Sequence, residues 1–292
     1  MIPFTYLEPS TLDEALALLA RHGDEAKLIA GGTGLVNFMK QRLVRPRFVI
    51  GLRALKSLAQ VEEEGGLRIG ALATLQSLAT GEPVRRCAPL LAEACGHVAT
   101  VRIRSMATIG GAIAHADPNL DTPPALMAMD AQIVARSQRG QRSIPADQFF
   151  TGYYETILAQ DEIVTEILIP EQPAGSGTAF LKFLPATQDD YATVSVAARL
   201  TLDANGIVSE ARVALGAAAM VPVRARAVEA MLSGKVGDAT TFREAATLVQ
   251  GAIDPIADFR GSAEYKRKMA VVHIHRALAE ASAKAMRPGG LS

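Results

Sequence analysis

Tryptophan is absent from this 292-residue chain, and aromatic residues make up only 5% of it. Neither sign of charge is in excess, since 30 lysines and arginines face 30 aspartates and glutamates. Nucleic-acid binding draws on clustered positive charge, and single strands are commonly held on aromatic side chains. The composition therefore argues against a nucleic-acid partner.

Cysteine is almost as scarce. Cys87 and Cys95 cannot by themselves form a disulfide framework or hold a zinc ion or an iron–sulfur cluster, and we expect them to be small buried hydrophobic residues. The five histidines form no metal-binding pattern, because His273 and His275 lie two apart on an expected helix and point to different sides. We expect no metal site on this chain, so any redox metal belongs to a partner.

Long hydrophobic runs are also missing. No stretch of about 20 apolar residues could span a membrane, and the N-terminus lacks the basic and apolar segments of a signal peptide. The hydrophobic content of 49% nevertheless supplies a large core and excludes intrinsic disorder. We expect a cytoplasmic protein of two or three domains.

Helical and strand patterns alternate through the first two thirds of the chain. In the first 60 residues, a helix capped by Ser10 or Thr11 precedes a strand at Lys27–Ala30, a helix from Leu35 and a strand at Phe48–Ile50. The middle third repeats this order, with expected strands at Leu67–Gly70 and Ile163–Ile169, helices from Thr74 and Leu90, and a hairpin through Gly140.

Residues 171–177 have the composition of a linker. Beyond them, the strands Thr193–Leu202 and Ile207–Leu215 flank the turn Asp203–Gly206, and three helical runs follow at Arg224–Leu232, Thr240–Gln250 and Ala263–Ala283. We predict an α+β fold with two domains. The first covers 1–174 and consists of two α/β subdomains divided near residue 60, and the smaller second covers 178–286.

Two glycine-rich strings stand out. Ala30-Gly31-Gly32-Thr33-Gly34-Leu35 lies between an expected strand and helix, where glycines let backbone amides face an anion. It is no dinucleotide fingerprint, because Asn37 stands where the third glycine belongs and no acidic residue lies about 20 positions on. It also lacks the Gly-Lys-Ser/Thr of a nucleotide triphosphatase loop. Taken alone, such a string is more often a plain tight turn than a phosphate-binding loop.

The second string, Thr108-Ile109-Gly110-Gly111-Ala112-Ile113-Ala114, is expected to form a similar turn after a short apolar strand. Asp121 follows ten residues after Gly111 and precedes Pro123, so it could bind a ribose or cap a helix. Two diglycine turns suit a ligand with two adjacent phosphates and a ribose.

Both strings resemble the FAD-binding signatures of the medium, flavin-carrying subunit of the molybdenum hydroxylases, the family of xanthine dehydrogenase and carbon monoxide dehydrogenase. Further strings resemble the same family in the same order: Phe149–Thr156 with Glu162–Val164, Lys182 with Asp190–Val194, and Arg260–Arg267. The likeness covers nearly the whole chain. It implies a two-part FAD-binding domain of the vanillyl-alcohol-oxidase-like type, followed by the smaller C-terminal domain.

The resemblance implies noncovalent FAD and a role for each matching residue. Leu28–Gly34 would wrap one side of the pyrophosphate, with Thr108–Ala112 on the other, Asp121 on the ribose, Lys182 near the flavin and Tyr191 over its ring. The implied cofactor-binding residues are Leu28, Ile29, Ala30, Gly31, Gly32, Thr33, Gly34, Thr108, Ile109, Gly110, Gly111, Ala112, Asp121, Ile163, Lys182 and Tyr191.

Plainer interpretations accompany several of these residues. Lys182 could be a solvated strand lysine, and Tyr191 could be a packing aromatic. Ala112 stands where many relatives carry asparagine, so only its backbone amide could bind the cofactor at this position. Gly34 replaces an aspartate that is common in relatives. His115 could carry a covalent flavin, but the resemblance implies noncovalent binding.

The function implied is electron transfer within a complex. A large molybdopterin subunit would oxidise the substrate, a small subunit with two [2Fe-2S] clusters would pass the electrons on, and the FAD of this chain would deliver them to a final acceptor. We expect no catalytic residue on this chain and a dimer of heterotrimers. The alternatives are a non-redox nucleotide-binding or assembly protein, and a self-contained flavin oxidase, against which the short C-terminal domain argues.

Overall fold

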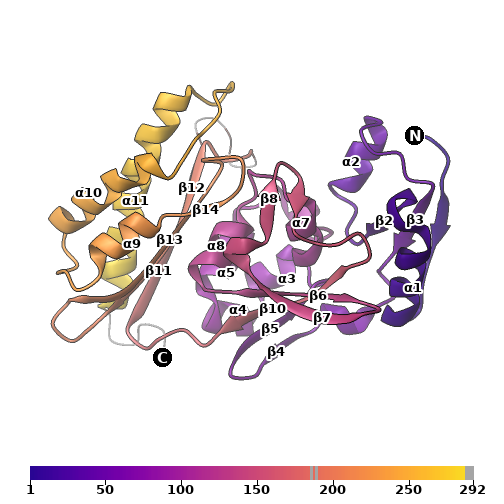
Figure 1. The fold of residues 1–292 in the computed structure, drawn as a ribbon. Helices are drawn as coiled ribbons and strands as arrows, with labels where there is room; N and C mark the ends of the chain where they lie inside the picture. The colour runs from indigo at the N-terminus through magenta and orange to yellow at the C-terminus, as the bar shows by residue number, and fades with distance from the viewer. Residues whose placement is uncertain (185–186, 188–189, 287–292) are drawn as a thin grey trace.

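The computed structural model describes residues 1–184, 187 and 190–286, and it is organised around three main sheets with their helices (Figure 1). The N-terminal unit is a parallel sheet in the order β1–β3–β2, built from β1 (Thr5–Leu7), β2 (Ala26–Ile29) and β3 (Phe48–Gly51). Helices α1 (Leu12–His22) and α2 (Leu35–Lys40) connect the strands. As predicted, α1 is capped by a hydroxyl, because Thr11 accepts a hydrogen bond from the amide of Glu14.

The middle unit is an antiparallel sheet in the order β4–β5–β10–β6–β7. Its strands are β4 (Val61–Glu63), β5 (Gly66–Gly70), β6 (Gln132–Ser137), β7 (Gly140–Pro145) and β10 (Ile163–Pro170), with β8 (Phe150–Gly152) and β9 (Glu155–Thr156) as a separate pair. Its helices are α3 (Leu75–Thr80), α4 (Glu82–Cys87), α5 (Pro89–Gly96), α6 (Val101–Arg104), α7 (Ile109–His115) and α8 (Thr122–Ala128). The predicted hairpin through Gly140 is confirmed.

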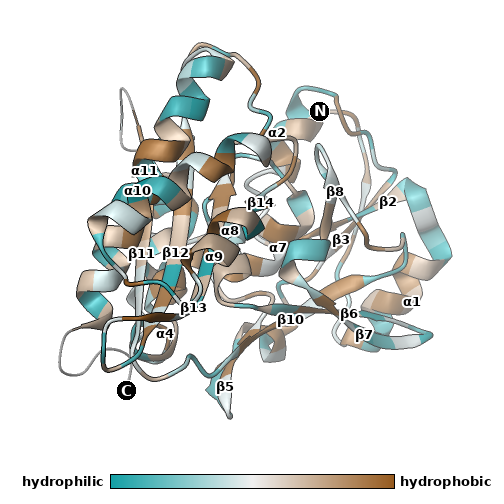
Figure 2. Ribbon diagram, turned by 60° about the vertical axis from the view of Figure 1, so that its left-hand side comes forward, coloured by the Kyte–Doolittle hydropathy of each residue, from teal (hydrophilic) through white to brown (hydrophobic). Residues whose placement is uncertain are grey.

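The C-terminal unit is an antiparallel sheet with helices on one face. Its strands are β11 (Ser176–Phe183), β12 (Val194–Leu202), β13 (Val208–Gly216) and β14 (Val223–Arg224), and its helices are α9 (Arg226–Leu232), α10 (Ala239–Thr247) and α11 (Ala263–Ala285). The predicted turn at Asp203–Gly206 is confirmed, since the Asp203 carboxylate accepts the amides of Asn205 and Ile207. In Figure 2 the hydrophobic stretches lie on the central strands, whereas the outward turns of α10 are hydrophilic. No helix in the described part of the chain has the length and apolar character needed to cross a membrane.

The structure differs from the sequence prediction at the second glycine string. Thr108 and Ile109 do not form a strand before a turn. Instead, the Thr108 hydroxyl accepts the amide of Gly111 at 3.2 Å and caps α7, so Gly110 and Gly111 lie in the first turn of this helix. The capping threonine thus begins a helix that the sequence pattern did not predict, because the two glycines in its first turn have a low helix propensity.

The inner face of the C-terminal sheet is ordered in rows, because alternate residues of β11, β12 and β13 point toward the middle unit. From one end to the other, the rows are the hydroxyl pair Ser176 and Thr201; Arg199 with Arg212; the apolar row Phe180, Ala197 and Ala214; and Lys182 with Ser195 and Gly216. The apolar row belongs to the same hydrophobic cluster as α5, α7 and α8. The core therefore continues across the predicted linker.

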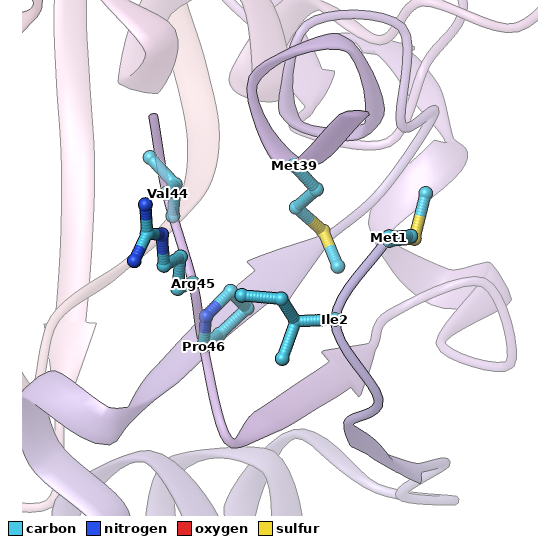
Figure 3. Close-up of a pocket in the computed structure, with 6 residues that line it drawn as sticks. All are labelled: Met1, Ile2, Met39, Val44, Arg45 and Pro46. Carbon is cyan, nitrogen blue, oxygen red and sulfur yellow. The ribbon is translucent and has the colours of Figure 1, made fainter. Parts of the chain in front are cut away.

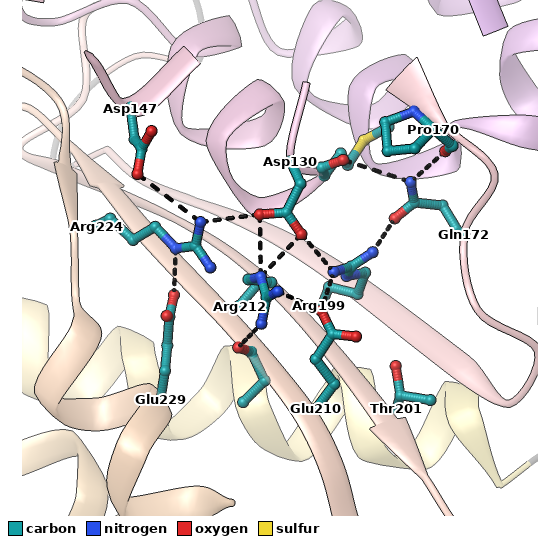
Figure 4. Close-up of polar contacts among 12 residues, drawn as sticks. Asp130, Asp147, Pro170, Gln172, Arg199, Thr201, Glu210, Arg212, Arg224 and Glu229 are labelled. Atoms are coloured by element: carbon teal, nitrogen blue, oxygen red, sulfur yellow. Dashed lines mark hydrogen bonds and ion pairs between the residues drawn. The ribbon is translucent and has the colours of Figure 1, made fainter. Parts of the chain in front are cut away.

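Asp130, just after α8, anchors the arginine row (Figure 4). Its carboxylate lies 2.8 to 2.9 Å from nitrogens of Arg199, Arg212 and Arg224, all from the C-terminal sheet. Glu210 pairs with the first two of these arginines, and Glu229 with the third. Arg199 is only 3% exposed, so burial lowers its pKa, and its charge depends on these partners. We call Asp130 with its three arginines the arginine clamp.

We expect Asp130→Asn to destabilise the protein by about 2–4 kcal/mol, because it removes the shared anion and leaves the arginine charges partly buried. Asparagine tolerates the positive φ of +53° at this position, so the substitution tests charge rather than backbone strain. Urea unfolding measures the loss. Asp254→Asn, which removes an exposed partner of Arg267, is the control and should leave the midpoint unchanged. Equal midpoints for both variants would contradict a structural role for the clamp.

Candidate functional site

The two glycine strings lie side by side. A Cβ at Gly31 would stand 1.9 Å from the carbonyl oxygen of Met106, just before the second string, so only glycine fits there. A Cβ at Gly111 would stand 3.7 Å from the Cβ of Ala30, and 2.8 Å from the Thr108 hydroxyl. Segments about 75 residues apart thus lie in contact.

The first string carries free backbone donors. Among the described residues, no acceptor lies within hydrogen-bonding distance of the amides of Gly31, Gly32, Thr33 and Gly34, and all four residues are half-buried. Gly32 has φ +72°, a conformation that glycine adopts without strain. Consecutive unpaired amides with a residue in the left-handed region form a concavity suited to an anion. We call Gly31–Gly34 the amide loop.

The second string behaves differently, because its amides are occupied. The amides of Ile109 and Gly110 donate to the carbonyls of Ala73 and Ala71, at 3.0 and 2.8 Å, and that of Gly111 donates to Thr108. Gly110 is required by packing, since a Cβ there would lie 2.5 Å from that of Ala71. What this string offers a ligand is therefore the Thr108 hydroxyl and the close approach at Gly111, rather than a second set of amides.

Asp121 and Lys182 form a buried ion pair between the middle unit and the C-terminal sheet. The Lys182 amine donates to Asp121 Oδ2 at 2.7 Å and to the His97 carbonyl at 2.9 Å, and the two side chains are 4% and 2% exposed. The interpretation of Lys182 as a solvated lysine is therefore wrong, and Asp121 makes no cap hydrogen bond to α8. Burial outweighs the lysine and raises the pKa of Asp121 to about 6. Asp121 Oδ1 has no partner among the described residues.

A second buried carboxylate was not singled out from the sequence. Asp117 accepts the Tyr154 hydroxyl at 3.1 Å and the amide of Asn119 at 2.9 Å. Burial, reinforced by the Asp117 carboxylate, raises the pKa of Tyr154 to about 12. The Tyr154 ring packs on Phe38 of α2, which follows the first glycine string, and on His115 of α7, which contains the second. The sequence Asp-Pro-Asn that begins at Asp117 is typical of an Asx turn, and this pattern could have drawn attention to Asp117 in the sequence.

The other predicted residues lie at several places in the structure. Tyr191 is 44% exposed and lies beneath the guanidinium of Arg260, whose carbon is 5.7 Å from the ring centroid. The His115 ring lies against Gly34, where a Cβ would be 2.8 Å from its Nε2. Ile163 packs in the N-terminal core, which Leu28 also contacts, and Ala112 is half-buried. Of the cysteines, Cys95 is buried and Cys87 half-buried, and both are free.

Open depressions occur elsewhere on the protein. A small one in the N-terminal unit has almost no free volume. It is lined by Met1, Ile2, Met39, Val44, Arg45 and Pro46 (Figure 3). An open groove of about 300 Å³ lies between α1 and the β6–β7 hairpin, beside Asp13 and Arg136. Neither includes the glycine strings. Within the described residues, histidine, cysteine and acidic side chains form no group that could hold a metal ion.

The amide loop, the Thr108 hydroxyl and a buried carboxylate with a spare oxygen are features typical of proteins that bind nucleotide cofactors. Comparison with known proteins agrees. Residues 2–172 match the family described as the FAD binding domain in molybdopterin dehydrogenase, and residues 179–281 match the CO dehydrogenase flavoprotein C-terminal domain.

Similar proteins extend over the whole chain. The carbon monoxide dehydrogenase medium chain of Hydrogenophaga pseudoflava is 37% identical over 97% of this chain and 99% of that one. The xanthine dehydrogenase FAD-binding subunit of Escherichia coli O157:H7 is 31% identical over 96% and 97%. A solved structure of carbon monoxide dehydrogenase from H. pseudoflava superposes with a TM-score of 0.93 at 38% identity, covering 97% of this chain and 99% of the matched chain.

The chain therefore belongs to the FAD-binding subunits of the molybdenum hydroxylase family. The sequence resemblance is confirmed, as is the α+β fold of an FAD-binding domain with a smaller C-terminal domain. Its relatives are oxidoreductases, and the comparisons do not favour the alternative of a non-redox protein that has kept the fold.

We expect the stability of the FAD-free chain to carry a pH dependence from Asp121. A carboxyl whose pKa rises from 3.8 in the unfolded chain to about 6 in the fold stabilises the protein below about pH 4, and this contribution disappears as the pH rises through about 6. The free energy of unfolding of wild type, relative to that of Asp121→Asn, should fall by roughly 2 kcal/mol between pH 4 and pH 7. Urea titrations at four pH values test this, and a constant difference would contradict the raised pKa.

Proposed function

We propose that the amide loop binds the pyrophosphate of FAD, with the Thr108 hydroxyl on the opposite side. The observation that carries this proposal is the run of four unpaired amides at Gly31–Gly34 beside the close approach at Gly111. Phosphate oxygens would accept hydrogen bonds from these amides. The glycines of the loop and Gly111 have no Cβ, which leaves room for the phosphates. Leu28, Ile29 and Ala30 lead into the loop, and Ile109, Gly110 and Ala112 hold the facing helix.

We propose further that Asp121, Lys182 and Tyr191 contact the rest of the cofactor. Asp121 Oδ1 is sealed from water without a partner, which is costly unless a ligand donates to it. Lys182 donates to the other oxygen of Asp121, Oδ2, and Tyr191 offers an exposed ring beside Arg260. Ile163 supports the first string from the N-terminal core. The residues present fit a noncovalent FAD, and His115, packed between Phe38 and Tyr154, need not carry a covalent link.

When bound, FAD accepts and donates electrons singly or in pairs, which suits a carrier between one-electron clusters and a final acceptor. The chain itself binds the cofactor, orients it and excludes water from one side of it. No nucleophile or general base is required of this chain for that role. We propose domains of 1–174 and 178–286, with the first divided near residue 60.

The two relatives named above, a medium chain and an FAD-binding subunit, are parts of larger enzymes. We propose that this chain works with a large molybdopterin subunit and a small [2Fe-2S] subunit, as a dimer of heterotrimers in the cytoplasm. The two free thiols fit a reducing compartment. The substrate pocket would then lie on the large subunit.

We expect Gly111→Val and Gly32→Ala each to weaken FAD binding by at least tenfold. Valine at 111 fills the space between the two strings, and alanine at 32 strains a φ of +72° in the amide loop. The control is Gly234→Ala, which imposes the same strain at φ +73° but meets no atom within 4 Å. Fluorescence titration of the FAD-free chain gives the affinities. If both loop variants fold and bind FAD like wild type, the strings are only turns.

We expect the native complex to contain two further chains, one of them cysteine-rich, that copurify with an affinity-tagged copy of this protein from its host. Acid precipitation of that complex should release FAD into the supernatant. Isolation of the chain alone with substrate dehydrogenase activity would instead support a self-contained oxidase. Yellow colour retained in the precipitate would contradict noncovalent binding.

A further inference from the structure

Tyr154 lies in the turn between β8 and β9 with its backbone in the left-handed region, at φ +55°. Turns that require this conformation normally use glycine or asparagine, because other side chains are strained there. The turn itself therefore gives no reason for a tyrosine, and this one is 47% exposed, so it contributes little to the core. A strained residue persists only where its surroundings compensate for the strain.

The strain at Tyr154 is shared with a neighbouring segment. Its amide donates to the carbonyl of Ala116 at 3.1 Å, and Ala116 itself has φ +52° at the end of α7. The carbonyl of Pro118 accepts the amide of Ala217, which has φ +57° and follows β13. Among the described residues, three of the six non-glycine residues with positive φ thus meet at 116–118. Strained backbone gathered at one place is typical of ligand sites.

The side chain of Tyr154 connects the middle unit with the N-terminal unit. Its hydroxyl donates to Asp117 at 3.1 Å, and its ring centroid lies 5.1 Å from that of Phe38 and 5.2 Å from that of His115. The rings of Phe38 and His115 also contact each other, with centroids 4.9 Å apart. Tilted aromatic contacts and a hydrogen bond to a carboxylate both stabilise this arrangement. We call Tyr154, Phe38 and His115 the aromatic bridge.

The aromatic bridge is linked to both walls of the proposed pyrophosphate site. On one side, α2 begins immediately after the amide loop, and the amide of Phe38 donates to the carbonyl of Gly34 at 3.2 Å. On the other side, His115 ends the helix that Thr108 caps, and its Nε2 would lie 2.8 Å from a Cβ at Gly34. A movement of α2 away from α7 would therefore carry the amide loop away from the Thr108 hydroxyl.

We propose that Tyr154 is a positioning residue for the cofactor, because through the aromatic bridge it sets the separation between the amide loop and Thr108. This inference rests on the proposed function, in which the pyrophosphate binds between these two groups. Without the bridge, α2 samples several positions, and only a fraction of the molecules presents both walls at the correct distance. The contacts that offset the strain at Tyr154 thus preorganise the site before the ligand arrives.

Tyr154→Asn tests the bridge, because asparagine tolerates the positive φ but lacks the ring. FAD and ADP share the pyrophosphate, so both should bind about tenfold more weakly, as expected if about a tenth of the FAD-free molecules remain competent. Tyr154→Phe keeps the ring and should bind both ligands within about threefold of wild type. Tyr153→Asn makes the same change one residue earlier in the same turn, at a side chain that is 45% exposed, and is the matched control. It should bind both ligands like wild type.

Hydrogen exchange separates positioning from a general loss of stability. In the FAD-free Tyr154→Asn variant, the amides of α2 should exchange faster than in wild type, because the helix is no longer held on α7. The amides of α1, in the same unit but away from the bridge, should keep their rates. A change that only destabilised the N-terminal unit would accelerate exchange in both helices.

Three results would overturn the inference. Affinities of Tyr154→Asn within about twofold of wild type for FAD and ADP would show that the bridge does not set the site. Loss of FAD binding alone would place Tyr154 on the flavin half, and unchanged exchange in α2 would show that other contacts hold this helix. The glycine variants report separately. Wild-type FAD binding by Gly32→Ala removes the proposed function itself, whereas its loss with unaffected Tyr154→Asn removes only this inference.

Discussion

The rest of the structure depends on the contact between the inner face of the C-terminal sheet and the helices α5 and α8. This face joins the FAD-binding part of the chain to the C-terminal part through three kinds of interaction in succession: charge at Asp130, hydrophobic packing around Phe180, and the buried pair of Asp121 and Lys182. Apolar burial provides the driving force for this contact. The polar interactions at its two ends, at Asp130 and at Asp121 with Lys182, fix the position of the sheet on the helices. Asp121 belongs to the middle unit and Lys182 to the C-terminal sheet. Their ion pair therefore forms only when this face is docked.

The two glycine strings show how similar local sequences acquire different roles. Both bring backbone close to a common centre, but only the first leaves its amides unpaired. In the second, Ala71 and Ala73 accept the amides that the sequence had suggested for a phosphate. The difference arises from a neighbouring segment rather than from the string, which is why the strings could be located but not distinguished.

Much of the fold followed from the sequence, because local patterns encode local structure. The hydroxyl at Thr11, the turn at Asp203–Gly206 and the helical run of α11 gave correct elements from residues close in the chain. The site was only partly accessible. Lys182 and Asp121 lie 61 positions apart, and the partners of Asp130 lie 69 to 94 away, so these pairings depend on domain docking. The small strands β1 and β14 were missed because three or two residues carry no detectable period.

The contact between Gly31 and the carbonyl of Met106 has a consequence for the order of assembly. One wall of the cofactor site is made in the N-terminal unit and the other in the middle unit, and neither wall is complete while the two are apart. Closing a contact between residues this distant is slow compared with forming a helix or a hairpin. In the proposed site, FAD contacts both units at once only after the two have docked.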